Sequence, residues 1–410
     1  MKPIFFAILF LAAPLCLLAD NVPPTDWVDS DTGHRIVRLS TEPGSESLYF
    51  NENAWTAEGD KLVYYSPSGV YDYNFKTRQN ELVVSGTNIA GIIVSRNSRT
   101  VYYVRRNNHE FTAYSTHLDT HETREIGKLP GGGSLAVNAN DTLLAGSFVE
   151  NGDHMPKPPT ESKGQWMEER LAAHQHMALF TMNIQTGKIH IFNHSTDWLN
   201  HLQFSPTDPN LILFCHEGPW HLVNRIWTIH ADGTGLTLIH HRTMQMEIAG
   251  HEFFSPDGKW IWYDLQTPKG EDFWLAGYEV ATGKRLQYHM QRDEWSIHFN
   301  TSYDGTLFAG DGGDSGQVAH AQNGRWLYLF HPRLISAASE LADKNFNAQD
   351  LIQTGVFDSE KLVNMSKQDY SLEPNVNFSP DGKWIVFRSN MFGPEYVFAV
   401  EVARASTEKM

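Results

Sequence analysis

Two segments of the chain repeat one another almost residue for residue, and this repeat constrains the fold more than any other feature. The first covers residues 251–264, HEFFSPDGKWIWYD, and the second covers residues 375–388, NVNFSPDGKWIVFR. In each, aromatic and β-branched residues flank a Ser-Pro-Asp-Gly turn, in which proline presets the first turn position and Asp-Gly tolerates a tight reversal. Each segment therefore predicts a β-hairpin.

The same pattern recurs in weaker form along the rest of the chain. Five further copies are Ala54–Tyr65, Ile92–Val104, Leu135–Phe148, Leu202–Cys215 and Ile297–Ala309. A second strand pair follows several copies, at Leu179–Ile191, Ile226–Leu238 and Gly277–Tyr288. Two hairpins make four strands, which is one propeller blade, so the sequence predicts an all-β, seven-bladed β-propeller.

The two ends of the repeat array complement each other. The last copy finishes with a strand near residues 396–402 and lacks an outer partner, whereas Asp31–Leu39 has the pattern of a turn followed by a strand. We expect this N-terminal strand to close the last blade, because closure removes an exposed sheet edge.

The spacing between copies is about one blade length except in two places, where residues 151–178 and 332–370 are inserted. They predict two helical loop insertions, at Trp166–Met177 and Leu334–Phe346. Such insertions often carry function, although a decorative role is the alternative.

The N-terminal segment has the pattern of a targeting signal. One lysine precedes an apolar run that ends at Ala19, too short for a typical membrane span. We expect a signal peptide at residues 1–19 and a single domain at residues 20–410, in a periplasmic or secreted protein without a membrane span after signal removal. A retained anchor is the alternative. Cys16 lies in the signal, so Cys215 would have no disulfide partner in the mature chain.

Charge argues against one class of partner. The formal net charge is -16, and no block of lysine or arginine stands out. Nucleic-acid binding requires clustered cations, so we expect no nucleic-acid partner.

Histidines mark a candidate site. His201, His251 and His298 stand at the same point of their copies, near the start of the innermost strand, and the last copy has Glu373 and Asn375 there. Inner strands of a propeller converge on one central channel, so these residues are expected to meet at one mouth. Imidazole titrates near neutral pH, which suits proton transfer, although a structural role is the alternative.

Two loops follow these inner hairpins. Residues 215–221, CHEGPWH, precede Arg225, and a second loop runs from Asp311 to Asp314. The second could bind a cation through its carboxylates, but an ordinary Gly-Asp turn is the favoured interpretation. The chain contains no nucleophile elbow, phosphate loop, zinc-protease motif or dinucleotide fingerprint.

Five strings in combination resemble a known family from about Asp31 to the C-terminus. They are residues 214–219 (FCHEGP), 222–227 (LVNRIW), 250–253 (GHEF), 302–306 (SYDGT) and 310–312 (GDG). The chain resembles the oligogalacturonate lyases of pectin-degrading bacteria. The resemblance implies a seven-bladed propeller that cleaves uronide oligosaccharides by β-elimination with a histidine base, an arginine and a divalent metal, often manganese. It implies that His251 is the base, that Arg225 is the arginine and that His298 is a metal ligand.

The chain departs from the family where the remaining metal ligands fall. The family has Gln, His and His there, and the matching positions are Tyr370, Glu373 and Asn375. Glu373 and Asn375 offer oxygen atoms, so with His298 they predict a harder metal site; an absent metal or an altered substrate are the alternatives. The expected substrate contacts are His201, His216, Glu217, Arg170 and Tyr370.

The candidate residues supply the groups that β-elimination requires. β-Elimination removes a weakly acidic proton next to a carboxylate, so a cation must neutralise that carboxylate while a neutral imidazole accepts the proton. Two alternatives remain: a non-catalytic periplasmic propeller resembling the TolB family that binds a protein or glycan partner, and a metal-dependent propeller hydrolase such as a lactonase.

Overall fold

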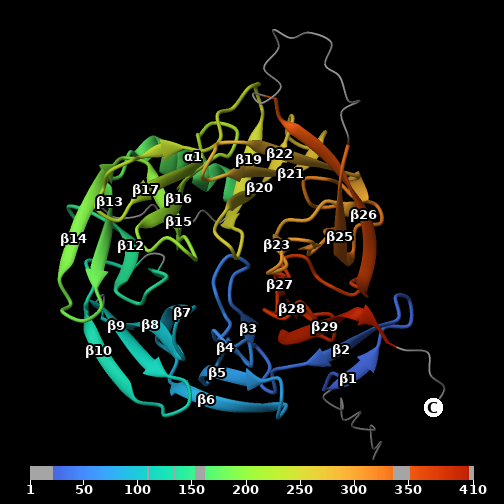
Figure 1. Cartoon of the computed structure of the whole chain (residues 1–410), viewed down its shortest axis with the longest axis horizontal. Coiled ribbons are helices and arrows are strands. Elements are labelled where there is room, and N and C mark those ends of the chain that lie inside the picture. The colour runs from blue at the N-terminus through green and yellow to red at the C-terminus, as the bar shows by residue number, and fades with distance from the viewer. Residues whose placement is uncertain (1–21, 109, 133–134, 153–161, 336–350, 406–410) are drawn as a thin grey trace, which may run out of the picture.

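The computed structural model describes residues 22–108, 110–132, 135–152, 162–335 and 351–405. β-Sheets form a ring around a central axis (Figure 1), which confirms the predicted all-β class. The expected signal peptide at residues 1–19 lies outside the described residues. Within the described ranges, no helix is both long enough and apolar enough to cross a membrane.

Four of the sheets are antiparallel and four-stranded. The first contains β3 (Glu46–Ser47), β4 (Lys61–Ser66), β5 (Gly69–Asn74) and β6 (Gln79–Ser85). The second contains β7 (Ile89–Val94), β8 (Thr100–Asn107), β9 (Glu110–His117) and β10 (Thr123–Lys128). The third contains β11 (Leu135–Val137), β12 (Leu143–Val149), β13 (Met177–Asn183) and β14 (Ile189–Ser195). The fourth contains β15 (Trp198–Phe204), β16 (Leu211–Glu217), β17 (Ile226–His230) and β18 (Thr237–Leu238).

An eight-stranded sheet follows along the chain. Its first half contains β19 (Ile248–Phe254), β20 (Trp260–Gln266), β21 (Phe273–Glu279) and β22 (Arg285–Met290). Its second half contains β23 (Phe299–Thr301), β24 (Phe308–Gly310), β25 (Trp326–Leu334) and β26 (Gln353–Asn364). Within each half all pairs are antiparallel, and the two outer strands β22 and β26 join the halves by parallel pairing.

The last sheet joins the two ends of the described chain. It contains β1 (Asp26–Val28), β2 (His34–Arg38), β27 (Asn377–Phe378), β28 (Trp384–Ser389) and β29 (Tyr396–Arg404). β2 pairs antiparallel with β29, so the predicted closure by the N-terminal strand is confirmed. β1 adds a fifth strand outside β2, which the sequence pattern did not indicate.

The core lies between neighbouring sheets, where apolar residues of one sheet face those of the next. One cluster joins Val63 of β4, Val101 of β8 and Val397 of β29, each almost completely buried. Each such buried aliphatic side chain contributes roughly 1.5–3 kcal/mol to the stability of the fold. The ring therefore holds the innermost strands β7, β15 and β19 in fixed positions around the axis.

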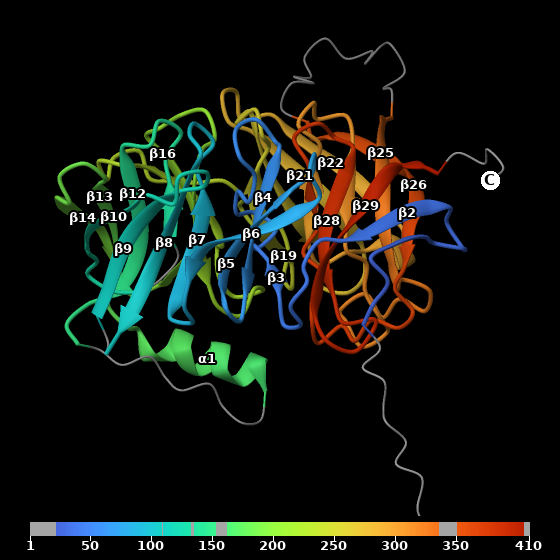
Figure 2. The same ribbon diagram turned by 90° about the horizontal axis from the view of Figure 1, so that it is seen from below.

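One α-helix interrupts the described strands. α1 spans Lys163–Ala173 and lies against one face of the ring (Figure 2). The expected range of Trp166–Met177 was wrong at both ends, because Ser162 caps the N-terminus, His174 takes a left-handed conformation and Met177 begins β13. A 3-10 helix, η1 (Arg292–Glu294), precedes β23.

The second expected helix, Leu334–Phe346, falls mostly outside the described residues. Its first residue belongs to β25, which pairs with β26 through Leu334 and Gly355, so the expected start of the helix was wrong. The aliphatic start of this stretch instead continues the antiparallel pairing of β25 with β26.

Candidate active site

Local backbone geometry directs several inner-strand side chains to the same region. His201 and His251 adopt positive φ angles of 51° and 47°, and each sits at a register shift in its strand, β15 or β19. A β-bulge of this kind re-aims a side chain out of the regular alternation. Asn375, just before β27, has φ 57°. Two of the three histidines of the register, together with Asn375, thus share a strained backbone conformation.

His251 is oriented by a carboxylate. Its Nδ1 lies 3.0 Å from Asp264 Oδ1, and both side chains are buried. A carboxylate only accepts hydrogen bonds, so Nδ1 carries the proton and Nε2 holds the lone pair of the neutral ring. Burial alone would lower the pKa of His251, but Asp264 raises it above the ordinary value.

His298 has the same kind of partner and is fully buried. Its Nδ1 lies 2.8 Å from Asp311 Oδ2, and its Nε2 lies 3.0 Å from the Tyr49 hydroxyl. The rings of His298 and His251 are 5.0 Å apart. Because Nδ1 donates to Asp311, the lone pair of Nε2 accepts from Tyr49. Asp311 is therefore an orienting carboxylate and not part of an ordinary surface turn, contrary to the favoured interpretation of this loop.

Arg225 is buried between two glutamates. Its Nη1 donates to Glu217 at 2.6 Å, its Nε donates to Glu252 at 3.1 Å, and no described residue accepts from Nη2. Burial alone would lower the pKa of Arg225, but neighbouring acidic groups, including these carboxylates, raise it well above the ordinary value. The guanidinium is permanently charged, and two carboxylates together outweigh its single positive charge.

His201 and Glu217 meet beside this arginine. His201 Nε2 lies 3.1 Å from Glu217 Oε2. Burial alone would raise the pKa of Glu217, but Arg225 and His201 lower it well below its usual range. Donor atoms of His201, Cys215 and Glu217 lie within 4.8 Å of one another, which makes these three residues a group that could hold a metal ion.

The residues of the last inner hairpin complete the candidate site on its other side. Glu373 Oε2 lies 3.7 Å from His298 Nε2, and the backbone N–H of Asn375 points at Asp311 Oδ2, 3.4 Å away. With its amide oxygen turned toward Arg388, Asn375 accepts from Nη2 and Nε, both at 3.0 Å. Tyr370 donates its hydroxyl to the Asp311 carbonyl oxygen at 3.3 Å, and burial raises its pKa well above the ordinary value.

The other two expected substrate contacts lie farther out. Arg170 of α1 stacks on the Trp198 ring, with its guanidinium carbon 3.4 Å from the ring centroid. Burial lowers the pKa of Arg170 to about 10, which leaves it charged at neutral pH. His216 alternates with Cys215 and Glu217 along β16, so it points to the opposite face, where it stacks on Trp227 and lies 3.4 Å from Asp197. His216 therefore does not join the other expected residues.

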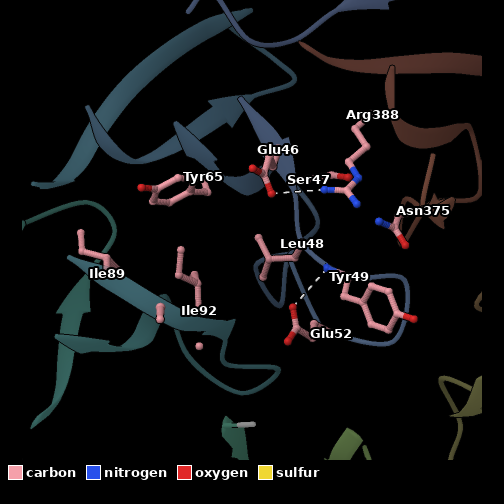
Figure 3. A pocket seen from close by; sticks show the side chains of 12 residues that line it. Glu46, Ser47, Leu48, Tyr49, Glu52, Tyr65, Ile89, Ile92, Asn375 and Arg388 are labelled. Atoms are coloured by element: carbon pink, nitrogen blue, oxygen red, sulfur yellow. Dashed lines mark hydrogen bonds and ion pairs between the residues drawn. The ribbon is translucent and has the colours of Figure 1, made fainter. Parts of the chain in front are cut away.

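A pocket of about 460 Å³ opens beside the His298 region. Tyr49, Asn375 and Arg388 line one side of it, and Ile89 and Ile92 of β7 line the other (Figure 3). This pocket gives ligands access to the same tyrosine that contacts His298.

Several residues of the site escaped the sequence analysis. Asp264 and Asp311 each follow their histidine by thirteen positions, so aligned repeat copies contained a signal that would have found them. Tyr49 precedes the first repeat copy and had no such signal. Trp220 donates to Glu217 at 3.0 Å, and its ring lies 5.3 Å from that of His251.

Comparisons with known proteins show which family this chain resembles over nearly its whole length. A family model described as oligogalacturonate lyase matches residues 23–406. The chain is 26% identical over 389 residues to an oligogalacturonide lyase of Pectobacterium atrosepticum, covering 92% of this chain and 95% of the relative. It is also 26% identical over 398 residues to an oligogalacturonate lyase of Dickeya dadantii, with the same coverage.

Solved structures show the same fold. An oligogalacturonate lyase in complex with manganese superposes with a TM-score of 0.74 at 23% identity, covering 92% of this chain and 96% of the other. An oligogalacturonate lyase from Vibrio parahaemolyticus gives a TM-score of 0.76 at 24% identity with the same coverage.

The ring of sheets, the carboxylate-oriented imidazoles and these matches define the class: the protein is a lyase with an all-β, propeller-like fold. Because the family model covers nearly the whole chain, the chain belongs to the oligogalacturonate lyase family.

Proposed function

We propose that this protein cleaves oligogalacturonides from pectin by β-elimination. The observation that carries the proposal is the buried His251–Asp264 pair, beside the permanently charged Arg225, in a chain of this family. The names of the relatives from Pectobacterium and Dickeya support the substrate class.

His251 is the base in the proposed reaction. Asp264 holds the proton on Nδ1, so Nε2 accepts the proton that lies next to the substrate carboxylate. The electron pair left on carbon forms a carbon–carbon double bond as the bond to the β-oxygen breaks. The leaving oxygen takes a proton from water and departs as a hydroxyl group, and His251 returns its proton to the solvent. Arg225 donates a hydrogen bond to the substrate carboxylate through Nη2, which offsets part of the developing negative charge. The remaining proposed substrate contacts are His201, His216, Glu217, Arg170 and Tyr370, of which His216 has the weakest structural support.

We infer a seven-bladed propeller from the strand order. Counting the two antiparallel halves of the eight-stranded sheet as two blades gives seven four-stranded units, with β1 as an addition to the last. We further propose a single domain at residues 20–410 with inserted stretches at 151–178 and 332–370. On the basis of the signal peptide expected at residues 1–19, we also propose export to the periplasm or the medium.

A divalent metal is part of the proposal because one solved relative is a manganese complex. The set implied by the resemblance is His298, Glu373 and Asn375, and its side chains fit a metal poorly as they stand. Tyr49 occupies the lone pair of His298 Nε2, and the oxygen of Asn375 faces the cationic Arg388. Of the three, only the Glu373 side chain accepts no hydrogen bond from a described residue, and its Oε2 lies 3.7 Å from His298 Nε2.

The group of His201, Cys215 and Glu217 fits a metal better by donor geometry. Imidazole, thiol and carboxylate together suit zinc or cobalt more than manganese. Burial raises the pKa of the Cys215 thiol well above its usual value, so a metal there must displace a proton. When bound, it would add positive charge beside Arg225.

One assay tests the proposed function. Purified protein is incubated with di- and trigalacturonate, and the ultraviolet absorbance of the unsaturated uronate product is followed, with and without EDTA. We expect absorbance to rise with these substrates and not with neutral galactose oligosaccharides. A flat trace with folded protein and added manganese or zinc would refute the lyase proposal.

A further inference from the structure

The inner hairpin of the last sheet, β27–β28, reverses the charge of a residue pair that the two preceding inner hairpins share. We call the pairs His251–Asp264, His298–Asp311 and Asn375–Arg388 the first, second and third dyads. In β19–β20 and β23–β24, an inner residue is His and the residue thirteen positions later is Asp: His251 with Asp264, and His298 with Asp311. In β27–β28 the corresponding residues are Asn375 and Arg388, which are hydrogen-bonded to each other. The same place in the repeat therefore holds a fixed cation instead of an orienting carboxylate.

We propose that Arg388 and Asn375 form a binding site for a carboxylate group of the acidic oligosaccharide. This inference rests on the proposed function for the identity of the ligand. It assigns to a side chain of this protein a positive charge beside Glu373, the neighbour of His298, where the resemblance implies a metal.

The position of Arg388 supports this assignment. Its Nε donates to the Glu373 backbone oxygen at 2.9 Å, and Glu373 contacts His298. Arg388 and Asn375 both line the pocket of about 460 Å³, and Figure 3 shows the guanidinium at the pocket wall above Tyr49. The guanidinium is thus connected to the centre and reachable by a ligand, with its side chain 18% exposed.

The present partners of Arg388 are replaceable. Nη1 lies 3.2 Å from Glu46 and 3.4 Å from Glu395. The Glu46 side chain is 47% exposed, so it can turn into solvent at little cost. Burial raises the pKa of Glu395 to about 7, which leaves this carboxyl partly uncharged at neutral pH. Arg225, in contrast, is held by two buried glutamates.

The charge of the centre favours a second cation. Arg225 lies between Glu217 and Glu252, and Glu373 stands beside His298. These three carboxylates repel a polyanionic sugar unless further cations are present. A planar guanidinium suits a carboxylate because it can donate two parallel hydrogen bonds.

The test compares binding of an acid and of its ester. Binding of digalacturonate and of its dimethyl ester is measured by calorimetry in the His251→Ala variant, which separates binding from turnover, with and without Arg388→Gln. We expect Arg388→Gln to weaken binding of the acid about 10- to 100-fold, the range for a charge-assisted hydrogen bond, and to leave the ester nearly unchanged. Arg388→Lys should retain part of the affinity for the acid.

A matched control is Arg99→Gln. Arg99 has similar exposure, 22%, and pairs with Glu58, Asp60 and Asp119 at the opposite end of the β7–β8 hairpin. It should leave both affinities unchanged. Thermal unfolding of every variant identifies any that fails to fold, and Arg388→Lys then carries the test.

Two results would overturn the site: unchanged affinity for the acid in Arg388→Gln, whether or not EDTA abolishes that affinity, or equal losses for acid and ester. The lyase proposal fails separately. Arg388-dependent binding of digalacturonate by a protein that produces no unsaturated product would retain the site and reject the reaction.

Discussion

The β19–β20 and β27–β28 hairpins have nearly the same sequence and opposite chemistry. Both have the Ser-Pro-Asp-Gly-Lys-Trp-Ile turn, and both bring an inner residue with positive φ to the centre, His251 in one and Asn375 in the other. In the first, Asp264 prepares an imidazole to accept a proton. In the second, Arg388 presents a positive charge.

This difference shows that the repeat specifies positions and not roles. The turn and the paired strands place residues X and X+13 side by side in both hairpins, whatever those residues are. A change of two side chains can then convert a proton-transfer dyad into an anion-binding dyad without altering the fold, because neither residue belongs to the apolar core between sheets.

The largest effect is expected when the base of the first dyad is removed. His251→Ala should lower kcat about 10²- to 10⁴-fold, the usual contribution of a positioned general base. The measurement is the rate of unsaturated product formation from digalacturonate. His289→Gln, a partly exposed histidine on the outer strand β22, is the control and should keep full activity. Full activity in His251→Ala would show that His251 is not the base, and the proposed difference between the two hairpins would then be wrong.

The two His–Asp dyads should differ in their effect on the pH profile. Asp264 raises the pKa of His251, so the neutral base accumulates only as the pH rises through that raised value. In Asp264→Asn the cause of the increase is gone. The acidic limb of kcat/KM should therefore move to lower pH, while kcat falls on the order of 10²-fold as orientation is lost.

Asp311→Asn is the matched variant in the second dyad. It should reduce activity without moving the acidic limb, because His298 accepts from Tyr49 and is not the base. The opposite pattern, with a shifted limb in Asp311→Asn alone, would transfer the role of base to His298.

The sequence predicted the architecture well because turns and alternating strands are local signals. All seven hairpin copies correspond to strand pairs or bridges of the structure, and closure by β2 followed from one missing strand. The ends of α1 were misplaced because His174 can adopt the left-handed cap that is more common for glycine and asparagine.

The site was less accessible from sequence. The histidines were found by their register, but their carboxylate partners come from the second strand and required the copies to be compared column by column. Tyr49 contacts His298 although the two are 249 positions apart in sequence. Cys215 becomes a candidate metal ligand only because the fold brings it next to His201 and Glu217. Contacts of this kind depend on how sheets converge on the axis, which no local pattern contains.

Converting the third dyad into a His–Asp pair like the first two should have a smaller effect, measured as a change in manganese affinity. In the double variant Asn375→His, Arg388→Asp, a cation is lost and an imidazole oriented by a carboxylate is gained beside His298 and Glu373. Manganese affinity, measured by calorimetry after EDTA treatment, should rise at least about 10-fold, since ligand charge and donor number both increase.

Cys215→Ser in the same background separates the two possible metal positions. If it removes the added manganese binding, the metal lies in the group of His201, Cys215 and Glu217, and the dyad exchange has not built a site. Retained binding places the new site at the exchanged dyad.

The smallest expected effect concerns the carboxylate that competes for Arg388. Glu46→Gln removes a negative charge 3.2 Å from Nη1 while preserving the size of the side chain. An exposed ion pair of this kind contributes about 0.2–1 kcal/mol, so binding of digalacturonate should tighten by a factor of about 1.4 to 5. The dimethyl ester should bind as before. If Glu46→Gln instead weakens binding of the acid, Glu46 positions the guanidinium of Arg388 and does not compete for it. Glu46 would then orient Arg388 as Asp264 orients His251.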